Sequence, residues 1–243
     1  EAETFYEPHF KEKFNLDLIL SNNYICHFMV MKRELMQQLL ERGEYNGAQD
    51  YDLVLRAAFT LSGREEAICH IPKVLYHWRC HSLSTAENPK SKLYAYEAGR
   101  RAVQDFVNQK GWKAEVQHTE HLGFYRVEYP EGVFTVRAEV GAAGGAVVKG
   151  GKIVGGRMNL SGEVFYQGLP VSFSGYMHRA ALAQDAEALD IRNMKVRPEL
   201  QELYKAVMTE ENTDILEKSL KLSEKIREAG YVLLYLPGNI RKV

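Results

Sequence analysis

The hydrophobic and polar positions in the first half of the chain follow two patterns, one typical of helices and one typical of extended strands. Apolar positions three and four residues apart predict a long amphipathic helix over 91–111, with Gly111 just beyond its end. The same spacing predicts a short helix over 33–43 and another that begins near Asp50. The β-branched run 67–78, broken by a proline, predicts a strand followed by a second extended piece.

The second half repeats this mixture. Alternating patterns on both sides of a Pro-x-Gly turn predict a hairpin over 124–138, and a glycine pair predicts another over 146–155. A helix is expected from Pro198, which suits a first helical position. A further helix over 213–230 begins at a Thr or Asn cap, and 231–237 closes as a strand. The pattern therefore predicts a mixed α/β or α+β fold.

Composition removes several classes of function. The chain has 45% hydrophobic and 26% charged residues, which is ordinary for a globular protein. A formal net charge of −1 gives no general attraction to nucleic acid, so no nucleic-acid partner is expected. No apolar run reaches the roughly 18 residues of a membrane span. The acidic start is unlike a secretory signal, and without an initiator Met we expect the chain to be part of something longer.

The sequence "NGAQDYDLVLRA" places two carboxylates, Asp50 and Asp52, immediately before an apolar helical stripe. Acidic residues are favoured in the first turn of a helix because they complement its dipole. The same pair would also suit a metal or catalytic site. From spacing alone, a helix start is the simpler interpretation.

Each of the three cysteines precedes a histidine, in the pairs Cys26–His27, Cys69–His70 and Cys80–His81. An odd number of cysteines argues against a disulfide framework and for a reducing compartment. Thiolate and imidazole are zinc ligands, so a small zinc protein is one hypothesis. However, no CxxC or HxxxH pair occurs, and neighbouring residues on a strand point to opposite faces. Buried free cysteines are the favoured interpretation.

Three motifs resemble a known family when taken in order. "NNYICHFMVMKREL", "YNGAQDYDLVLRA" and "HIPKVLYHWRCHSLSTA" are similar to the acceptor-side half of a family-two glycosyltransferase of the GT-A fold. The likeness covers about residues 6–110 and is greatest to tandem-domain bacterial enzymes of polysaccharide and rhamnan synthesis. The stretch from 139 to 200 looks like the middle of a second such domain.

This resemblance implies a partial GT-A-like sheet flanked by helices, a β-hairpin linker and a second α/β unit. The expected domains are an acceptor-side half over 1–112, a β connector over 113–138 and a partial second domain over 139–243. Family members also have a donor-binding half with a metal-holding D-x-D motif. The D-x-D in this chain, Asp50–Asp52, lies in a different motif, so both donor-binding halves are expected to be absent.

The resemblance also implies roles for individual residues. Asp50 matches the catalytic base that takes the proton from the acceptor hydroxyl. The donor and leaving-group positions match His77, Arg79, His81 and Ser84, with His77 also a metal ligand. The acceptor side matches Tyr24, His27 and Gln49. In the second segment, His178, Arg179, Gln184 and Asp185 mark either an acceptor edge or helix-surface charge.

The function implied is transfer of a sugar from a nucleotide-sugar donor to a growing bacterial glycan, with help from Mn²⁺ or Mg²⁺. The alternative is a non-catalytic interaction or scaffold module derived from such an enzyme. We expect the isolated chain to be inactive and, because a missing half would expose apolar surface, to be either a homodimer or a monomer that self-associates readily. The expected location is cytoplasmic, either free or peripheral to the inner face of the membrane.

Overall fold

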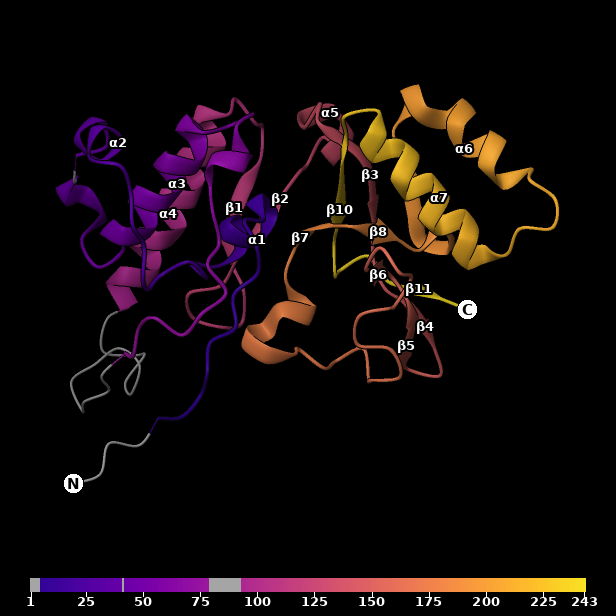
Figure 1. The fold of residues 1–243 in the computed structure, drawn as a ribbon, viewed down its shortest axis with the longest axis horizontal. Helices are drawn as coiled ribbons and strands as arrows, with labels where there is room; N and C mark the ends of the chain where they lie inside the picture. The colour runs from indigo at the N-terminus through magenta and orange to yellow at the C-terminus, as the bar shows by residue number, and fades with distance from the viewer. Residues whose placement is uncertain (1–4, 41, 79–92) are drawn as a thin grey trace. The chain divides into compact units, whose positions relative to one another are not determined.

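A computed structural model describes residues 5–40, 42–78 and 93–243 (Figure 1). The chain divides into two compact units, Glu1–Glu128 and Tyr129–Val243, and this division falls inside the predicted connector. Each unit combines helices with small sheets, which confirms the mixed α/β class. No helix in the described ranges is both long and apolar enough to cross a membrane.

In the described part of the first unit, helices come first and the strands β1 and β2 come last. Its elements are α1 (Leu16–Ser21), α2 (Arg33–Gln38), η1 (Gly43–Tyr45), α3 (Gln49–Thr60), η2 (Glu65–Ala67), α4 (Leu93–Gln109), β1 (Glu115–His118) and β2 (Tyr125–Glu128). The strands pair antiparallel, with Val116 opposite Val127. Helix α4 packs against α3 and β1, while α1 packs against β2.

The long helix α4 confirms the prediction over 91–111. Its buried residues recur at helical spacing and form one face: Ala98, Gly99, Ala102, Val103, Phe106 and Val107. Gly99 allows the closest approach, because a Cβ there would lie 2.3 Å from the hydroxyl oxygen of Tyr125. That hydroxyl donates a hydrogen bond of 2.8 Å to the carbonyl of Tyr96. The absent side chain of Gly99 therefore lets the Tyr125 side chain of β2 lie against α4.

One prediction for this unit is confirmed only in part, and another is wrong. The helix expected over 33–43 ends at Gln38, where Leu39 leaves helical geometry, and none of its residues is buried. A short helix without packing gains little from propensity alone. The run 67–78 forms no strand, and within the described part of this unit the sheet consists of β1 and β2. Pro72 lacks a backbone donor, and an extended segment without a partner forms no ladder.

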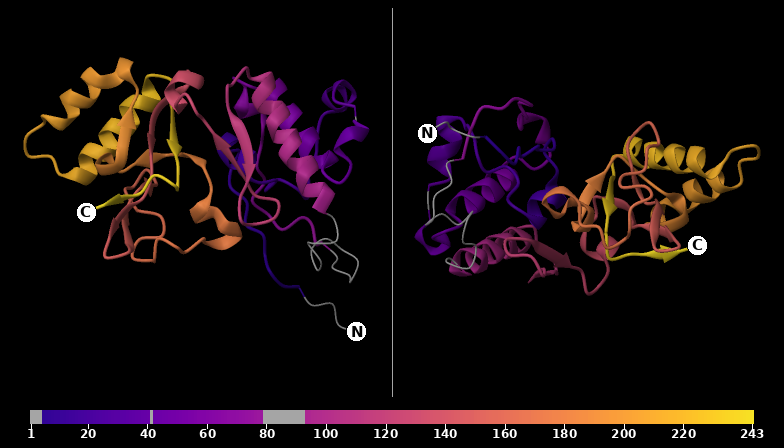
Figure 2. Two further views of the ribbon diagram at one scale, coloured as in Figure 1. Left: turned by 180° about the vertical axis from the view of Figure 1, so that it is seen from behind. Right: turned by 90° about the horizontal axis from the view of Figure 1, so that it is seen from below.

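The second unit is built on a four-stranded sheet in the order β7–β10–β3–β9, in which β3 and β10 are parallel (Figure 2). Its strands are β3 (Val140–Gly144), β4 (Val147–Lys149), β5 (Lys152–Gly155), β6 (Arg157–Met158), β7 (Gln184–Ala186), β8 (Ala188–Leu189), β9 (Met194–Val196), β10 (Val232–Tyr235) and β11 (Arg241–Lys242). Its helices are α5 (Val133–Val136), η4 (Tyr176–Ala181), η5 (Ile191–Asn193), η6 (Pro198–Leu200), α6 (Gln201–Met208) and α7 (Ile215–Glu228). Leu222 and Ile226 of α7 pack into the core formed with β3 and β10.

The hairpin predicted over 146–155 is confirmed. Strands β4 and β5 pair antiparallel, with Lys149 opposite Lys152. Gly150 and Gly151 between them have φ values of 57° and 77°. A two-residue turn with both central residues at positive φ matches the twist of the flanking strands, and glycine adopts it at little cost.

The hairpin predicted over 124–138 is wrong, although its turn forms. The N–H of Gly132 donates a 2.9 Å hydrogen bond to the carbonyl of Tyr129. The residues that follow form α5 instead of a strand, and β2 pairs with β1. A tight turn fixes local geometry only, and here another partner for β2 was available.

The predictions for residues 198–237 agree more closely with the structure. Pro198 occupies the first position of η6, directly before α6. Helix α7 ends before Gly230, as expected, but its cap is Asp214 rather than Thr or Asn. Asp214 and Glu217 form a reciprocal capping box, which satisfies two otherwise unpaired backbone donors. The closing strand is β10.

Candidate functional site

Asp50 and Asp52 lie in the first turn of α3 and have different surroundings. Residues two positions apart on a helix differ by about 200°, so the two carboxylates face nearly opposite sides. Asp52 is buried and forms ion pairs with Arg42 at 2.6 Å and with Arg56 at 2.8 Å. Asp52 is therefore held in buried ion pairs with two arginines of its own unit.

Asp50 has a different partner. The side-chain amide of Asn23 donates a hydrogen bond of 3.1 Å to Asp50 Oδ2. Asp50 is half-buried, and within the described ranges it forms no ion pair with a basic residue. Asp50 is therefore oriented by a hydrogen bond rather than paired in a salt bridge with a described residue.

Cys26 and His27 lie beside this carboxylate. Cys26 Sγ is 2.8 Å from His27 Nδ1 and 3.3 Å from Nε2. The ligand-type atoms of Cys26, His27 and Asp50 all lie within 4.8 Å of one another, which makes them a possible metal-binding group. Burial, together with the hydrogen bond and charge of Asp50, raises the pKa of the Cys26 thiol well above its usual range.

This arrangement corrects one expectation. Cys26 and His27 were expected to point to opposite faces of a strand, but residues 25–30 have no strand structure. Their side chains can therefore meet. The Lys11 ammonium supports the segment by donating hydrogen bonds to the carbonyls of Ile25 and His27. Burial lowers the pKa of Lys11.

The other two acceptor-side residues, Tyr24 and Gln49, are close in sequence to Cys26 and Asp50. Each forms side-chain hydrogen bonds with backbone groups. The hydroxyl of Tyr24 accepts a hydrogen bond from Asn15 N–H at 2.9 Å and donates one to the Lys13 carbonyl at 3.0 Å. Gln49 is exposed, and its side-chain oxygen accepts the N–H of Gly47 at 2.7 Å, directly before α3. Tyr24 thus fixes the segment before Cys26, and Gln49 fixes the start of the helix that carries Asp50.

An aromatic group flanks His27. The ring centroid of His27 lies 4.7 Å from that of Trp78 and 5.5 Å from that of Tyr76. His77 itself points elsewhere, with its ring 4.3 Å from that of Phe5. In the described part of the chain, His77 belongs to no group of three metal-ligand residues. Arg79, His81 and Ser84 lie outside the described residues.

Of the residues singled out in the second unit, His178 and Arg179 lie on the 3-10 helix η4, and Gln184 and Asp185 lie on the strand β7. His178 Nδ1 is 3.1 Å from Ser174 Oγ. Gln184 is fully buried and donates to the carbonyls of Arg179 and Leu182. Asp185 is the β7 residue paired opposite Leu234 of β10. These contacts hold η4 against the edge of the sheet.

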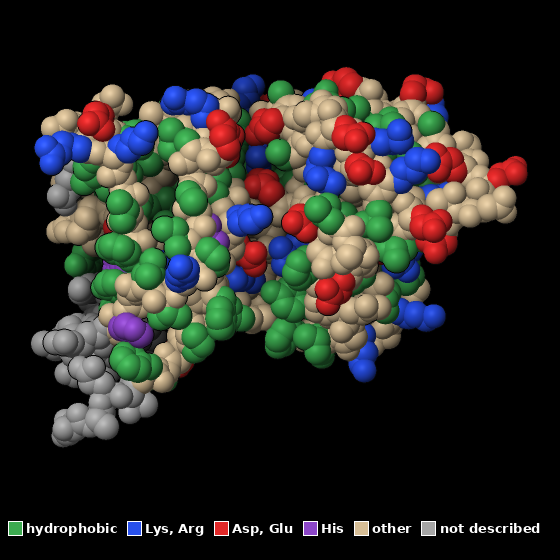
Figure 3. All heavy atoms as spheres, viewed as in Figure 1, with side chains coloured by type: hydrophobic (Ala, Val, Ile, Leu, Met, Phe, Trp, Pro, Cys, Tyr) green, Lys and Arg blue, Asp and Glu red, His purple; other side chains and the backbone are tan. Residues whose placement is uncertain are grey.

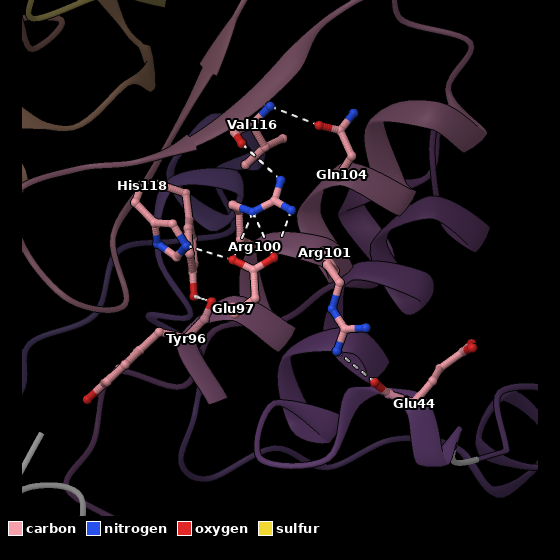
Figure 4. Close-up of polar contacts among 9 residues, drawn as sticks. Glu44, Tyr96, Glu97, Arg100, Arg101, Gln104, Val116 and His118 are labelled. Atoms are coloured by element: carbon pink, nitrogen blue, oxygen red, sulfur yellow. Dashed lines mark hydrogen bonds and ion pairs between the residues drawn. The ribbon is translucent and has the colours of Figure 1, made fainter. Parts of the chain in front are cut away.

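A polar cluster missed by sequence reasoning joins α4 to β1 (Figure 4). The Glu97 carboxylate accepts hydrogen bonds from Arg100 at 2.8 Å and lies 3.0 Å from His118 Nε2. Arg100 also donates to the carbonyl of Val116 at 3.2 Å. The hydrogen bonds from Arg100 and then His118 lower the pKa of Glu97 to about 2. The i,i+3 spacing of Glu97 and Arg100 was visible in the sequence, but the partner strand was not.

Asn23 and Lys11 were also missed as contributors to the Asp50 site. Asn23 lies inside the first recognised motif, yet nothing in that motif indicates which side chain it contacts. Lys11 acts through backbone carbonyls, and such contacts leave no pattern in the sequence.

The ligand set favours some cations over others. Mg²⁺ and Mn²⁺ prefer carboxylate, carbonyl and water oxygens, whereas thiolate and imidazole favour zinc. The Cys26–His27–Asp50 group therefore does not fit the Mn²⁺ or Mg²⁺ expected from the resemblance. The described residues offer no other group of three candidate ligands.

Comparisons with known proteins find partial relatives. Over 108 residues the chain is 42% identical to Uncharacterized protein y4gI of Sinorhizobium fredii (strain NBRC 101917 / NGR234), covering 44% of this chain and 12% of that protein. Over 125 residues it is 38% identical to the O-antigen biosynthesis protein RfbC of Myxococcus xanthus, covering 51% of this chain and 9% of that protein. No family model and no solved structure matches the chain.

The chain thus resembles proteins much longer than itself, because the matched stretch spans only about a tenth of each relative. One of these two relatives is named for O-antigen biosynthesis. The likeness connects about half of this chain to that protein.

Proposed function

We propose that this chain takes part in bacterial polysaccharide synthesis and that its first unit forms the acceptor side of a sugar-transfer site. The likeness to an O-antigen biosynthesis protein supports the polysaccharide class. The resemblance of the motifs to family-two glycosyltransferases supports the reaction type. The observation that carries the proposal is the Asp50 carboxylate, which Asn23 orients and no described basic residue neutralises.

In the proposed reaction, Asp50 acts as the general base. A hydroxyl of the acceptor glycan gives its proton to the Asp50 carboxylate while its oxygen attacks the anomeric carbon of the donor sugar. The bond from that carbon to the nucleoside diphosphate breaks, and the diphosphate leaves with the bonding electrons. Asn23 donates a hydrogen bond to Oδ2, which orients the carboxylate towards the acceptor hydroxyl in this proposal.

The test measures release of nucleoside diphosphate by the full-length polypeptide that carries this chain. The donors are UDP-glucose, UDP-N-acetylglucosamine and dTDP-rhamnose, and the acceptor is purified O-polysaccharide. Asp50→Asn should lower turnover about 10²- to 10⁴-fold, as loss of a general base does. Glu34→Gln, which changes the first-turn acid of α2, is the matched control and should keep normal turnover. Near-normal turnover in Asp50→Asn would refute the assignment.

A non-catalytic interaction module is the second candidate, and the surface of the first unit favours it. Large apolar side chains stand exposed there, among them Phe28, Val30, Val74, Leu75 and Trp78. Hydrophobic side chains are visible on the surface of both units in Figure 3. Exposed apolar groups of this size are typical of surfaces that dock onto a partner, and a second copy of the chain is the partner proposed.

Donor binding separates the two candidates. Calorimetric titration of the full-length polypeptide with UDP, GDP and dTDP in the presence of Mn²⁺ should give saturable binding if it is a transferase. Complete absence of binding, together with a concentration-dependent dimer in sedimentation, would favour the interaction module.

A further inference from the structure

Three side chains with metal-binding chemistry converge at the start of α3. Cys26 and His27 come from the segment after α1, and Asp50 comes from the first turn of α3. Their ligand atoms lie within 4.8 Å of one another, and Cys26 Sγ is 3.3 Å from His27 Nε2. Two segments distant in sequence thus bring together a thiol, an imidazole and a carboxylate.

These separations suit a tetrahedral cation. Zinc binds sulfur at about 2.3 Å, and imidazole nitrogen and carboxylate oxygen at about 2.0–2.2 Å. Neighbouring ligands around such an ion are therefore roughly 3.3–3.8 Å apart. The separation of 3.3 Å between Cys26 Sγ and His27 Nε2 lies at the lower end of this range, and all three ligand atoms lie within 4.8 Å of one another.

We propose that Cys26, His27 and Asp50 bind Zn²⁺ through one atom each, with a fourth position open to water or another ligand. The soft thiolate and the imidazole select zinc over Mg²⁺ and Mn²⁺. The proposal concerns binding alone and does not rest on the sugar-transfer function. Because Zn²⁺ would occupy the Asp50 carboxylate, the zinc-bound chain and the chain with Asp50 as a free base are two alternative states of the site.

Neighbouring side chains hold Asp50 and the segment that carries Cys26 and His27. Asn23 donates to Asp50 Oδ2, and such outer hydrogen bonds orient metal-ligating carboxylates. Lys11 donates hydrogen bonds to the carbonyls of Ile25 and His27, which fixes the segment that carries the other two ligands. The Lys11 charge is the one cationic group that these contacts place beside the site, and it will weaken binding of a dication.

The chain provides its own control. Cys69 is also followed by a histidine, His70, but in the described ranges this pair belongs to no group with a third ligand. Cys69 is exposed and free. Any binding caused merely by an adjacent thiol and imidazole should therefore occur equally at Cys69.

The experiment uses Co²⁺ as a spectroscopic substitute for zinc. Reduced full-length chain is titrated with CoCl₂, and the thiolate-to-cobalt charge-transfer absorption is recorded in the presence of excess MgCl₂. We expect the absorption to saturate at one Co²⁺ per chain and to be abolished by one equivalent of ZnCl₂. Cys26→Ser should abolish it, His27→Gln and Asp50→Ala should weaken Co²⁺ binding at least tenfold, and Cys69→Ser should leave it unchanged.

Circular dichroism of each variant shows whether its fold is retained. His27 is exposed, so His27→Gln remains informative even if Cys26→Ser unfolds. Charge-transfer absorption that survives in folded Cys26→Ser, or that is unchanged in His27→Gln, would overturn the proposal. So would the absence of any such absorption in the wild-type chain at millimolar Co²⁺.

Discussion

The side-chain amide of Asn23 donates a hydrogen bond of 3.1 Å to Asp50 Oδ2 and thereby joins the segment after α1 to the first turn of α3. This is a positioning contact, since Asn23 fixes the carboxylate that is proposed to accept the proton. Its effect on turnover should therefore depend on whether Asp50 is present.

Asn23→Ala should lower kcat about tenfold with little change in KM, because a hydrogen bond to a charged group contributes about 1.5 kcal/mol. In the Asp50→Asn background, the same substitution should cost almost nothing further. Steady-state kinetics of the two single variants and the double variant measure this. Equal losses in both backgrounds would show that Asn23 acts independently of Asp50.

Asp52 should matter for stability rather than for turnover. Its side chain is 3% exposed and holds both Arg42 and Arg56, so Asp52→Asn leaves two guanidinium groups without their partner. We expect a loss of about 3 kcal/mol in the free energy of unfolding, measured by urea denaturation. Glu44→Gln is the control: Glu44 lies 3.6 Å from Arg42 with 61% of its side chain exposed, and its removal should cost under about 1 kcal/mol.

Glu97 should make stability depend on acidity. Hydrogen bonds from Arg100 and His118 lower its pKa from 4.5 to about 2. The ionised form is therefore favoured in the folded state, so its contribution is complete above pH 4.5 and declines as the pH falls towards 2. Because Glu97 is about half exposed, the contribution should stay below about 1 kcal/mol.

Urea denaturation of the wild-type chain and Glu97→Gln over this range provides the measurement. The difference in stability between them should be constant at neutral pH and shrink below pH 4.5. A difference that grows as the pH falls would contradict the assigned direction.

Gly99→Ala tests the contact between α4 and β2. Alanine gains up to about 1 kcal/mol over glycine in a helix, yet its Cβ would lie 2.3 Å from the Tyr125 hydroxyl oxygen. We expect a net loss of about 1–3 kcal/mol from overpacking. Tyr125→Phe removes the atom that clashes, so the double variant should lose less than the sum of the single losses. Thermal denaturation of all three variants checks this, and a stabilised Gly99→Ala would exclude the close contact.

Local signals in the sequence predicted the local elements well. The periodic face of α4, the glycine pair between β4 and β5, and Pro198 at the start of η6 all depend on residues close to one another in the chain. The run 67–78 failed because a strand requires a partner elsewhere, and the pattern of one segment cannot show whether that partner exists.

In the Asp50 site, too, the features set by nearby residues could be predicted, and those set by distant contacts could not. The opposite environments of Asp50 and Asp52 follow from helical geometry once α3 is known. The approach of Cys26 and His27 to Asp50 could not be predicted, because it depends on an irregular segment held by Lys11 and Asn23. Irregular backbone has no period, and its path is set by contacts distant in sequence.

The parallel pairing of β3 with β10 also constrains how the second unit is made on the ribosome. Gly144 ends β3 and Val232 begins β10. The two strands are therefore synthesised at different times, although they lie side by side in the sheet. At about 5–20 residues per second, the ribosome completes β10 on the order of 4–20 s after β3. All five residues of β3 are buried in the finished sheet, so a nascent chain carries them without their parallel partner throughout that interval. The parallel pairing of β3 is therefore completed only after β10 has been synthesised, and slower translation between the two strands should lengthen that interval.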